Sequence, residues 1–385
     1  MIYLDNAATS FPKPPEVVEE TVRFLTQISG SAGRSGHRLS VEAGRVVYHT
    51  REALAELFSI DDPLRIAFGH NVTEALNLVL QGLLQPGDHV VTSSVEHNSM
   101  MRPLRALEQA GVRVSVVPCS PQGALDPNDL RAAVTPQTRL IALNHASNVI
   151  GTLLPIREAG QIARERGILL LVDAAQTAGC YPIDVNEDSI DLLAFTGHKA
   201  LLGPTGTGGL YIGPRVQVEQ LQPLMRGGTG SRSEHELQPD FMPDKYESGT
   251  GNALGLAGLG AGVRFILRSG VRAIRAHEEE LTRQLLEGLL RLSEVRVYGP
   301  HDPARQTGTV SFNLDGWQPS EVSEELDERY AILSRPGLHC SPATHRTIGT
   351  YPGGTVRLSL GAFSTADEVA TAVEAVGAMA KEAEQ

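Results

Sequence analysis

The stretch Asp191-Leu192-Leu193-Ala194-Phe195-Thr196-Gly197-His198-Lys199 says most about the fold and chemistry of this 385-residue chain. Residues 192–195 are apolar and have the length of a buried β-strand, and a polar turn with a lysine at its tip follows them. Burial at a strand end lowers the pKa of a lysine and frees its amine for Schiff-base chemistry. The alternative is a surface lysine in a turn, which the residue types alone favour.

Short apolar runs alternate with helical patterns on both sides of this stretch, from about residue 14 to residue 215. Strand candidates are 66–68, 89–92, 112–117, 140–143, 168–172, 192–195 and 210–212, and helical spacing is clearest in 40–57 and 74–80. Strands that alternate with helices predict parallel βαβ crossovers and a sheet covered on both faces. The sequence therefore predicts an α/β fold.

The alternation of short apolar runs with helical patterns ends at about residue 215. An irregular stretch rich in glycine, proline and acidic residues covers 227–249, and a helical region and a smaller α+β segment follow it. Loops of this length in a compact domain tend to be functional or to wrap a partner. We predict a large domain over residues 14–255 and a small domain made of residues 1–13 and 256–385.

Composition argues against several classes of function. The charge sum is −12 with no lysine- or arginine-rich block, which is the wrong sign for a nucleic-acid partner. Apolar runs fall far short of the roughly 20 residues that cross a bilayer, and the first residues do not read as a secretion signal. The three widely spaced cysteines fit a reducing compartment. We expect a cytoplasmic protein without a nucleic-acid or membrane partner.

Two polar motifs follow strand candidates. Asp173 ends the run 168–172, and an acid at that end of a parallel strand faces the crevice where open α/β sheets bind ligands. Such an acid could keep a pyridine nitrogen protonated, although a helix N-cap explains Asp173 equally well. Asn71 and Glu74 have the spacing of a capping box, and the N–H groups at such a helix start also suit a phosphate. The glycine-rich run 203–209 is no P-loop, because Lys199 precedes it and a strand follows.

Three further residues are candidates for chemistry. His97 could stack on a flat cofactor, although a lone histidine in a loop is more often solvated. Cys340 lies beside His339 and between two arginines, and such electropositive company favours a nucleophilic thiolate. A packed structural cysteine is the main rival, and a metal site of His339, Cys340 and His345 is disfavoured because it lacks a second ligand cluster. Arg357 on a predicted strand could clamp a carboxylate or pair with an acid.

Taken in order, these motifs resemble the class V aminotransferase family of pyridoxal-phosphate enzymes, and within it the group II cysteine desulfurases and selenocysteine lyases. The resemblance covers nearly the whole chain. The matching stretches are Tyr3-Leu4-Asp5-Asn6-Ala7-Ala8-Thr9, Thr73-Glu74-Ala75-Leu76-Asn77, Glu96-His97-Asn98, Ala146-Ser147-Asn148-Val149-Ile150-Gly151, Val172-Asp173-Ala174-Ala175-Gln176, Gly197-His198-Lys199, Glu247-Ser248-Gly249-Thr250, Arg335-Pro336-Gly337-Leu338-His339-Cys340 and Thr355-Val356-Arg357-Leu358-Ser359.

The resemblance implies an aspartate-aminotransferase-like fold, pyridoxal 5′-phosphate as cofactor, and no metal. It implies a role for each matched residue. Lys199 would bond to the cofactor aldehyde, Asp173 and Gln176 would contact the ring nitrogen and ring oxygen, and His97 would stack on the ring and act in catalysis. Val72, Thr73, Thr196 and His198 would hold the phosphate, with Thr250 reaching in from a second subunit. Asn148, Arg335 and Arg357 would bind the substrate, and Cys340 would accept its sulfur.

The implied activity is removal of sulfur from L-cysteine by a homodimer, giving L-alanine and a persulfide on Cys340 that a sulfur-acceptor protein could take. Selenocysteine lyase is the near alternative. Another class V aminotransferase or C–S lyase, or a non-enzymatic sulfur shuttle, would use the same scaffold differently. Two segments depart from the family pattern. Asn71-Val72-Thr73 stands where desulfurases commonly have glycine and two threonines, and residues 341–350 differ from the best-known sulfur-mobilising enzymes.

Overall fold

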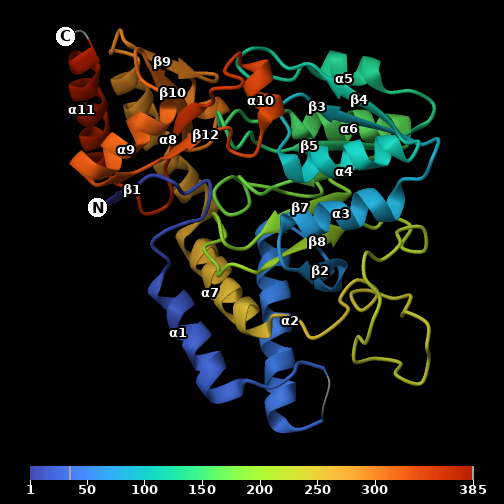
Figure 1. Cartoon of the computed structure of the whole chain (residues 1–385). Coiled ribbons are helices and arrows are strands. Elements are labelled where there is room, and N and C mark those ends of the chain that lie inside the picture. The colour runs from blue at the N-terminus through green and yellow to red at the C-terminus, as the bar shows by residue number, and fades with distance from the viewer. Residues whose placement is uncertain (34–35, 384–385) are drawn as a thin grey trace.

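A seven-stranded sheet forms the centre of the computed structural model, which describes residues 1–33 and 36–383 (Figure 1). Its strand order is β2-β8-β7-β6-β5-β3-β4. The strands are β2 (Ile66–Gly69), β3 (His89–Ser93), β4 (Arg113–Val117), β5 (Thr138–Asn144), β6 (Leu169–Asp173), β7 (Leu192–Thr196) and β8 (Gly208–Ile212). Neighbouring strands from β4 to β7 are parallel, whereas β8 runs antiparallel to both β7 and β2. The predicted α/β fold with a mostly parallel sheet is confirmed.

Both faces of this sheet are covered, as the apolar runs predict. In β6, Leu170 and Val172 belong to one core, whereas Leu171 between them belongs to the core on the opposite face. The first core includes residues of α2 (Arg38–Phe58), α5 (Pro127–Ala133), α6 (Ile156–Arg166) and α7 (Ala253–Ser269). The second includes residues of α3 (Val72–Leu83) and α4 (Asn98–Gln109). Side chains in a strand alternate between faces, so a strand that is buried on both sides must be apolar throughout.

The helical elements of this part of the chain precede, connect or follow the strands of the seven-stranded sheet. They are α1 (Pro15–Arg23), η1 (Phe24–Ile28), α2 (Arg38–Phe58), η2 (Pro63–Arg65), α3 (Val72–Leu83), α4 (Asn98–Gln109), α5 (Pro127–Ala133), α6 (Ile156–Arg166) and α7 (Ala253–Ser269). The described residues between β8 and α7 contain no helix or strand, which agrees with the irregular texture predicted for 227–249.

A smaller α+β unit follows α7. Its antiparallel sheet has the order β12-β13-β10-β9, from β9 (Val295–Tyr298), β10 (Thr309–Leu314), β12 (Arg335–Gly337) and β13 (Thr355–Ser359). The helical elements are α8 (Val271–Leu289), η3 (Pro303–Arg305), α9 (Pro319–Tyr330), α10 (Pro342–Thr347) and α11 (Ala366–Ala383). Of these, α8, α9 and α11 pack on a third core in which Phe312, Leu326 and Val356 are fully buried.

The first residues of the chain belong with this smaller unit. Strand β1 (Ile2–Tyr3) pairs in parallel with β11 (Ile332–Leu333), and Asp5 forms an isolated bridge with Ser359. The chain then crosses to the large sheet, where Ser10 N–H donates to His198 O. The exact domain boundary at residue 255 stays a prediction. It falls in the first turn of α7, whose residues Leu259 and Val263 are buried in a core of the large sheet.

Among the described residues, no single helix has the length and apolarity to cross a membrane. The pair α7 and α8 meets that test only together and is bent by 80° at the break between its helices.

Candidate active site

One cavity of about 270 Å³ brings together nine of the residues that the sequence singled out. They come from the start of α3, from the last residues of β6 and β7, and from segments that follow β3, β5, β6 and β7, so they gather where the parallel strands end. Ligands of open α/β sheets bind at that edge. The nine residues are Val72, Thr73, His97, Asn148, Asp173, Gln176, Thr196, His198 and Lys199.

Lys199 lies in the cavity wall three residues beyond β7, and its side chain is half-buried. Burial lowers the pKa of the Lys199 ammonium to about 8, and Asp173 opposes this change by its negative charge. A lower pKa leaves a larger fraction of the amine neutral and nucleophilic near neutral pH. The alternative of a solvated surface lysine does not hold.

Asp173 is the last residue of β6 and is buried, in register with Asn144 of β5. Its side chain accepts a hydrogen bond of 2.9 Å from Ala175 N–H, but the described residues 174–180 form turns and no helix. The helix N-cap alternative for Asp173 is therefore wrong. Burial raises the pKa of its carboxyl, and Lys199 counteracts that effect.

The start of α3 forms another wall of the cavity. Asn71 is its N-cap and accepts a 3.0 Å hydrogen bond from Glu74 N–H, as predicted. The reciprocal half of the capping box is wrong, because Glu74 accepts from His70 N–H, one residue before the cap. The first N–H groups of a helix have no partner within the helix, so those of Val72 and Thr73 are available to an anion in the cavity.

His198 adds an unsatisfied polar group to this wall. Its Nδ1 is buried and has no hydrogen-bond partner within the described chain. Burial and the charge of Lys199 lower the pKa of the ring to about 4, so it is neutral near pH 7. Gln176 lies across the cavity and donates from Nε2 to Ala7 O at 3.1 Å.

His97 has a second role besides lining the cavity, because it is the N-cap of α4. Its Nδ1 accepts a hydrogen bond of 3.0 Å from Ser99 N–H, which fixes the proton of the neutral ring on Nε2. Burial, Lys199 and the arginines nearby lower the pKa of His97 to about 4. The ring is therefore held neutral in one tautomer.

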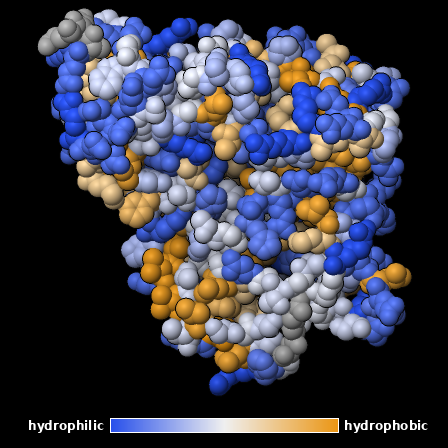
Figure 2. All heavy atoms as spheres, viewed as in Figure 1, coloured by the Kyte–Doolittle hydropathy of each residue, from blue (hydrophilic) through white to orange (hydrophobic). Residues whose placement is uncertain are grey.

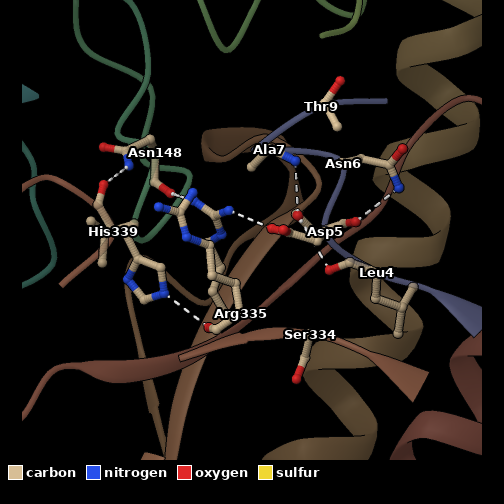
Figure 3. A network of polar contacts seen from close by, with 12 residues as sticks. Leu4, Asp5, Asn6, Ala7, Thr9, Asn148, Ser334, Arg335 and His339 are labelled. Atoms are coloured by element: carbon tan, nitrogen blue, oxygen red, sulfur yellow. Dashed lines mark hydrogen bonds and ion pairs between the residues drawn. The ribbon is translucent and has the colours of Figure 1, made fainter. Parts of the chain in front are cut away.

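Arg357 is buried in the middle of β13 and meets an acid that we did not single out, Asp5. Its Nη2 lies 2.6 Å from Asp5 Oδ1, and its Nη1 donates to Asn148 O at 2.9 Å. Asn148 Nδ2 in turn donates to His339 O at 2.7 Å, which leaves Asn148 Oδ1 buried without a partner among the described residues. Figure 3 shows Asn148, His339 and Arg335 converging on this network, with Asp5 on its far side.

Cys340 is exposed on the loop between β12 and α10. Asn98 N–H donates to Cys340 O at 2.9 Å, and Ser341 Oγ donates to Glu96 O at 2.8 Å. These bonds attach the loop to the residues on either side of His97. Arg335 Nη2 lies 4.0 Å from Cys340 Sγ, so the predicted positive neighbour is present. Because Cys340 is exposed, the alternative of a packed structural cysteine is wrong.

A pair of buried histidines supports the Cys340 loop. His339 Nε2 contacts Arg335 O at 3.0 Å, His339 Nδ1 contacts His345 Nε2 at 3.3 Å, and His345 Nδ1 contacts Thr350 Oγ1 at 2.7 Å. A carbonyl oxygen only accepts, so every proton in this chain of bonds is assigned if both rings are neutral. Burial lowers their pKa values to about 3 and about 4. Across the described ranges, no three metal-binding side chains group together.

Thr250 lies apart from the Lys199 cavity of its own chain. It is exposed and lines a separate cavity of about 160 Å³ with Glu247, Asn252 and Gly69. Gly69 precedes the α3 N-terminus by three residues. A role for Thr250 in phosphate binding thus requires a second copy of the chain.

The sequence reasoning missed three buried or ion-paired residues around the cavity. Asp5 pairs with Arg357, Asn144 lines the cavity, and Glu96 is a fully buried acid that accepts from Asn144 N–H at 2.9 Å. Asp5 and Glu96 lie within stretches that carry the family resemblance, which was the available signal.

The chain belongs to the class V aminotransferase family, whose model, Aminotransferase class-V, matches residues 2–371. The predicted family is thereby confirmed. A probable cysteine desulfurase of Methanothermobacter thermautotrophicus is 37% identical over 372 residues, which cover 96% of this chain and 92% of the relative. A cysteine desulfurase of Pectobacterium atrosepticum is 32% identical over 378 residues, covering 96% of this chain and 90% of the relative.

Solved structures of cysteine desulfurases are also similar to this chain. The apo structure of a cysteine desulfurase from Thermococcus onnurineus superimposes with a TM-score of 0.92 at 34% identity and covers 99% of this chain and 95% of its own. The S-sulfonic acid form of the cysteine desulfurase CsdA from Escherichia coli has a TM-score of 0.85 at 31% identity, with 99% and 94% covered.

Proposed function

We propose that this chain is a pyridoxal-phosphate-dependent cysteine desulfurase that converts L-cysteine to L-alanine and leaves the sulfur on Cys340. The observation that carries the proposal is the attachment of the Cys340 loop to the Lys199 cavity. Asn98 N–H, which bonds to Cys340 O at 2.9 Å, belongs to the residue after His97, and His97 lines the cavity with Lys199. The relatives named above support the same activity.

The residues of the cavity fit the cofactor of this family. An amine that suits an aldehyde, an acid that suits a ring nitrogen, and a helix start that suits a phosphate line one space, together with the unsatisfied Nδ1 of His198. Lys199 would bond to the aldehyde, Asp173 would face the ring nitrogen, and Val72 and Thr73 would bind the phosphate. When bound, pyridoxal 5′-phosphate supplies an electron sink for negative charge at the substrate α-carbon.

Side chains of this protein would carry out the other roles in the reaction. Lys199, with its lowered pKa, can take and return the α-proton of the substrate. Asp173, held at the end of β6, would keep the ring nitrogen of the bound cofactor protonated. His97 presents a neutral ring to the cavity. The side-chain oxygen of Asn148 is buried without a partner among the described residues, and Arg357 Nη1 donates to the main-chain oxygen of the same residue.

Cys340 performs the sulfur transfer itself. Its thiolate attacks the substrate sulfur, a new S–S bond forms, and the electron pair of the broken Cβ–S bond stays on carbon until a proton completes alanine. The substrate supplies all electrons, so no separate oxidant or reductant takes part. Arg335 Nη2 lies 4.0 Å from this sulfur and places a positive charge beside it.

The proposal extends to a cytoplasmic homodimer. Exposed apolar side chains gather on α1, η1 and α2, and Figure 2 shows them clustered at the lower left of the molecule. Contiguous exposed apolar surface commonly marks an interface. A phosphate-binding role for Thr250 would also need a second copy, because Thr250 lines a cavity separate from the Lys199 cavity of its own chain. The exposed apolar residues are Val18, Val22, Leu25, Leu39, Val41 and Tyr48.

The test compares alanine formation from L-cysteine by the cofactor-loaded protein and two cysteine variants. Cys340→Ala should abolish turnover of cysteine, whereas the matched control Cys119→Ala, which changes a half-buried thiol, should retain it. Lys199→Ala should abolish turnover and the visible absorption of the protein. Full cysteine turnover by Cys340→Ala would refute a sulfur-accepting role for this thiol.

Selenocysteine lyase is the alternative activity that the same test separates. A selenol is a better leaving group than a thiol, so selenocysteine turnover would persist in Cys340→Ala if the thiol serves only as the sulfur acceptor. An aminotransferase or another C–S lyase would turn over its own substrate equally well with and without the Cys340 thiol.

A further inference from the structure

A surface groove of about 610 Å³ lies beside Cys340, between α4 and α10. Both helices are fixed close to the thiol. Asn98, the first residue of α4, donates its N–H to Cys340 O, and Pro342, the first residue of α10, follows Cys340 by two positions. The two helices lie next to each other on one side of the molecule (Figure 1).

The groove is basic although the protein as a whole has a charge of −12. Arg102, Arg105 and Arg346 line it and are exposed, and no acidic side chain joins them among the described lining residues. Arg105 pairs with Glu108 at 2.7 Å on the surface of α4. Within residues 1–33 and 36–383, neither Arg102 nor Arg346 forms an ion pair, and Arg346 instead stacks its guanidinium 4.4 Å from the ring centre of Tyr351.

The lining of the groove is partly apolar and includes half-buried Met101, Val116, Pro342 and Ala343. The three positive charges lie on two helices, with Arg102 and Arg105 on α4 and Arg346 on α10. Carboxylates spaced along a polypeptide can meet charges on both helices at once.

We propose that this groove docks an acidic polypeptide segment of the thiol protein that takes sulfur from Cys340. This inference rests on the proposed desulfurase function. In the transfer, a thiolate of the docked protein attacks the outer sulfur of the Cys340 persulfide, and the S–S bond to Cys340 breaks. Cys340 leaves as a thiolate, the acceptor becomes the persulfide, and no oxidant or reductant is consumed.

The groove supplies what this transfer needs. The thiolate of an acidic protein has to approach a sulfur on an enzyme that repels it overall, and a local basic surface converts that repulsion into attraction. Charge complementarity of this kind raises the association rate and selects the partner. His339 and Cys340 have left-handed backbone, with φ of 50° and 57°, and the Cys340 thiol is exposed two residues before Pro342 of the groove.

The probes are three synthetic peptides that carry one cysteine flanked by glutamate, by glutamine or by lysine residues. Holoenzyme loaded with persulfide on Cys340 is mixed with each peptide, and the rate of peptide persulfide formation is followed by mass spectrometry. We expect the glutamate peptide to react at least tenfold faster than the lysine peptide at low salt. This preference should shrink in 0.5 M salt, because exposed charges are screened.

The variant Arg102→Glu/Arg105→Glu should abolish or reverse the preference, while alanine formation with dithiothreitol as acceptor stays unchanged. Arg291→Glu/Arg296→Glu is the matched control, since it reverses two exposed charges in the small unit, outside the groove. Equal rates for the three peptides, or an equal effect of both double variants, would overturn the proposal. So would a comparable advantage for 2-mercaptoethanesulfonate, which would show attraction of any small anion.

Binding measured without turnover separates this inference from the proposed function. A fluorescent glutamate peptide in which serine replaces the cysteine should bind wild-type protein and lose at least tenfold in affinity with Arg102→Glu/Arg105→Glu. A protein that makes no alanine yet shows this binding would refute the desulfurase function and retain the groove. A protein that makes alanine but does not bind the peptide would refute the groove alone.

Discussion

Arg357 Nη2 lies 2.6 Å from Asp5 Oδ1, in an ion pair that joins residues 352 positions apart in the chain. Arg357 is almost completely buried, whereas the Asp5 side chain keeps about a fifth of its exposure. The pair holds the N-terminal segment against β13 at the point where the segment crosses toward Lys199. Burial lowers the pKa of Arg357 and the charge of Asp5 opposes this, so the guanidinium depends on its carboxylate partner.

Asp5→Asn should therefore destabilise the fold by about 3 kcal/mol, because removal of one partner leaves a buried charge uncompensated. Urea denaturation monitored by circular dichroism measures the change. Glu280→Gln, which breaks an exposed pair with Arg283 on α8, is the control and should leave the midpoint nearly unchanged. An equal, small effect of both variants would show that the Asp5 charge contributes nothing to stability.

The lowered pKa of Lys199, about 8, predicts the pH dependence of cofactor incorporation. Only the neutral amine reacts with an aldehyde, so the rate should rise about tenfold per pH unit at low pH and level off above about pH 8. Stopped-flow absorbance after mixing cofactor-free protein with pyridoxal 5′-phosphate measures this rate. Lys199→Arg should give no visible band. A rate that still climbs steeply beyond pH 9.5 would mean that burial does not perturb this lysine.

Local sequence patterns predict most strands of the seven-stranded sheet and the end of the strands where the cavity lies. The strand candidates 192–195 and 168–172 lie within one residue of β7 and β6, because strands covered on both faces must be continuously apolar. The same property could not reveal strand direction. The antiparallel course of β8 depends on contacts distant in sequence. One such contact is the close approach of Gly208 to Asn71, because a Cβ at position 208 would lie 2.8 Å from Asn71 Cα.

Local sequence patterns predict less of the active site than of the fold. Lys199 and Cys340 are 141 residues apart, and no spacing rule shows that Asn98 N–H would bring the Cys340 loop to His97. That juxtaposition came from the family resemblance. Asp5 and Glu96 remained unassigned because a short acidic residue near a strand or loop has no periodicity, and its partner is distant or is a backbone group.

Glu96 predicts a loss of stability with rising pH. The acid is fully buried, accepts from Ser93 Oγ at 2.6 Å, and burial raises its pKa to about 8. Its folded pKa exceeds the unfolded value, so the folded state binds the extra proton between about pH 4.5 and 8. The free energy of unfolding should fall across this range as pH rises. Glu96→Gln should flatten that slope in urea titrations at several pH values, and an unchanged slope would exclude Glu96 as its source.

The His339–His345 pair predicts the opposite pH response. Both pKa values lie below the usual 6.5, so the unfolded chain binds more protons between about pH 6.5 and 4, and stability should fall as pH falls through this range. His345→Leu should flatten this acid slope. At pH 7 it should cost about 1–3 kcal/mol, because His339 Nδ1 and Thr350 Oγ1 lose their partner.

The conservative variant His345→Gln retains an N–H donor and should recover part of that stability, and with it the cysteine turnover that depends on the loop carrying Cys340. Turnover at pH 7 and unfolding at pH 5 and 7 distinguish the two variants. If His345→Gln and His345→Leu behave alike in both measurements, the hydrogen-bonded chain from Thr350 to Arg335 does not position the thiol, and packing alone shapes the loop.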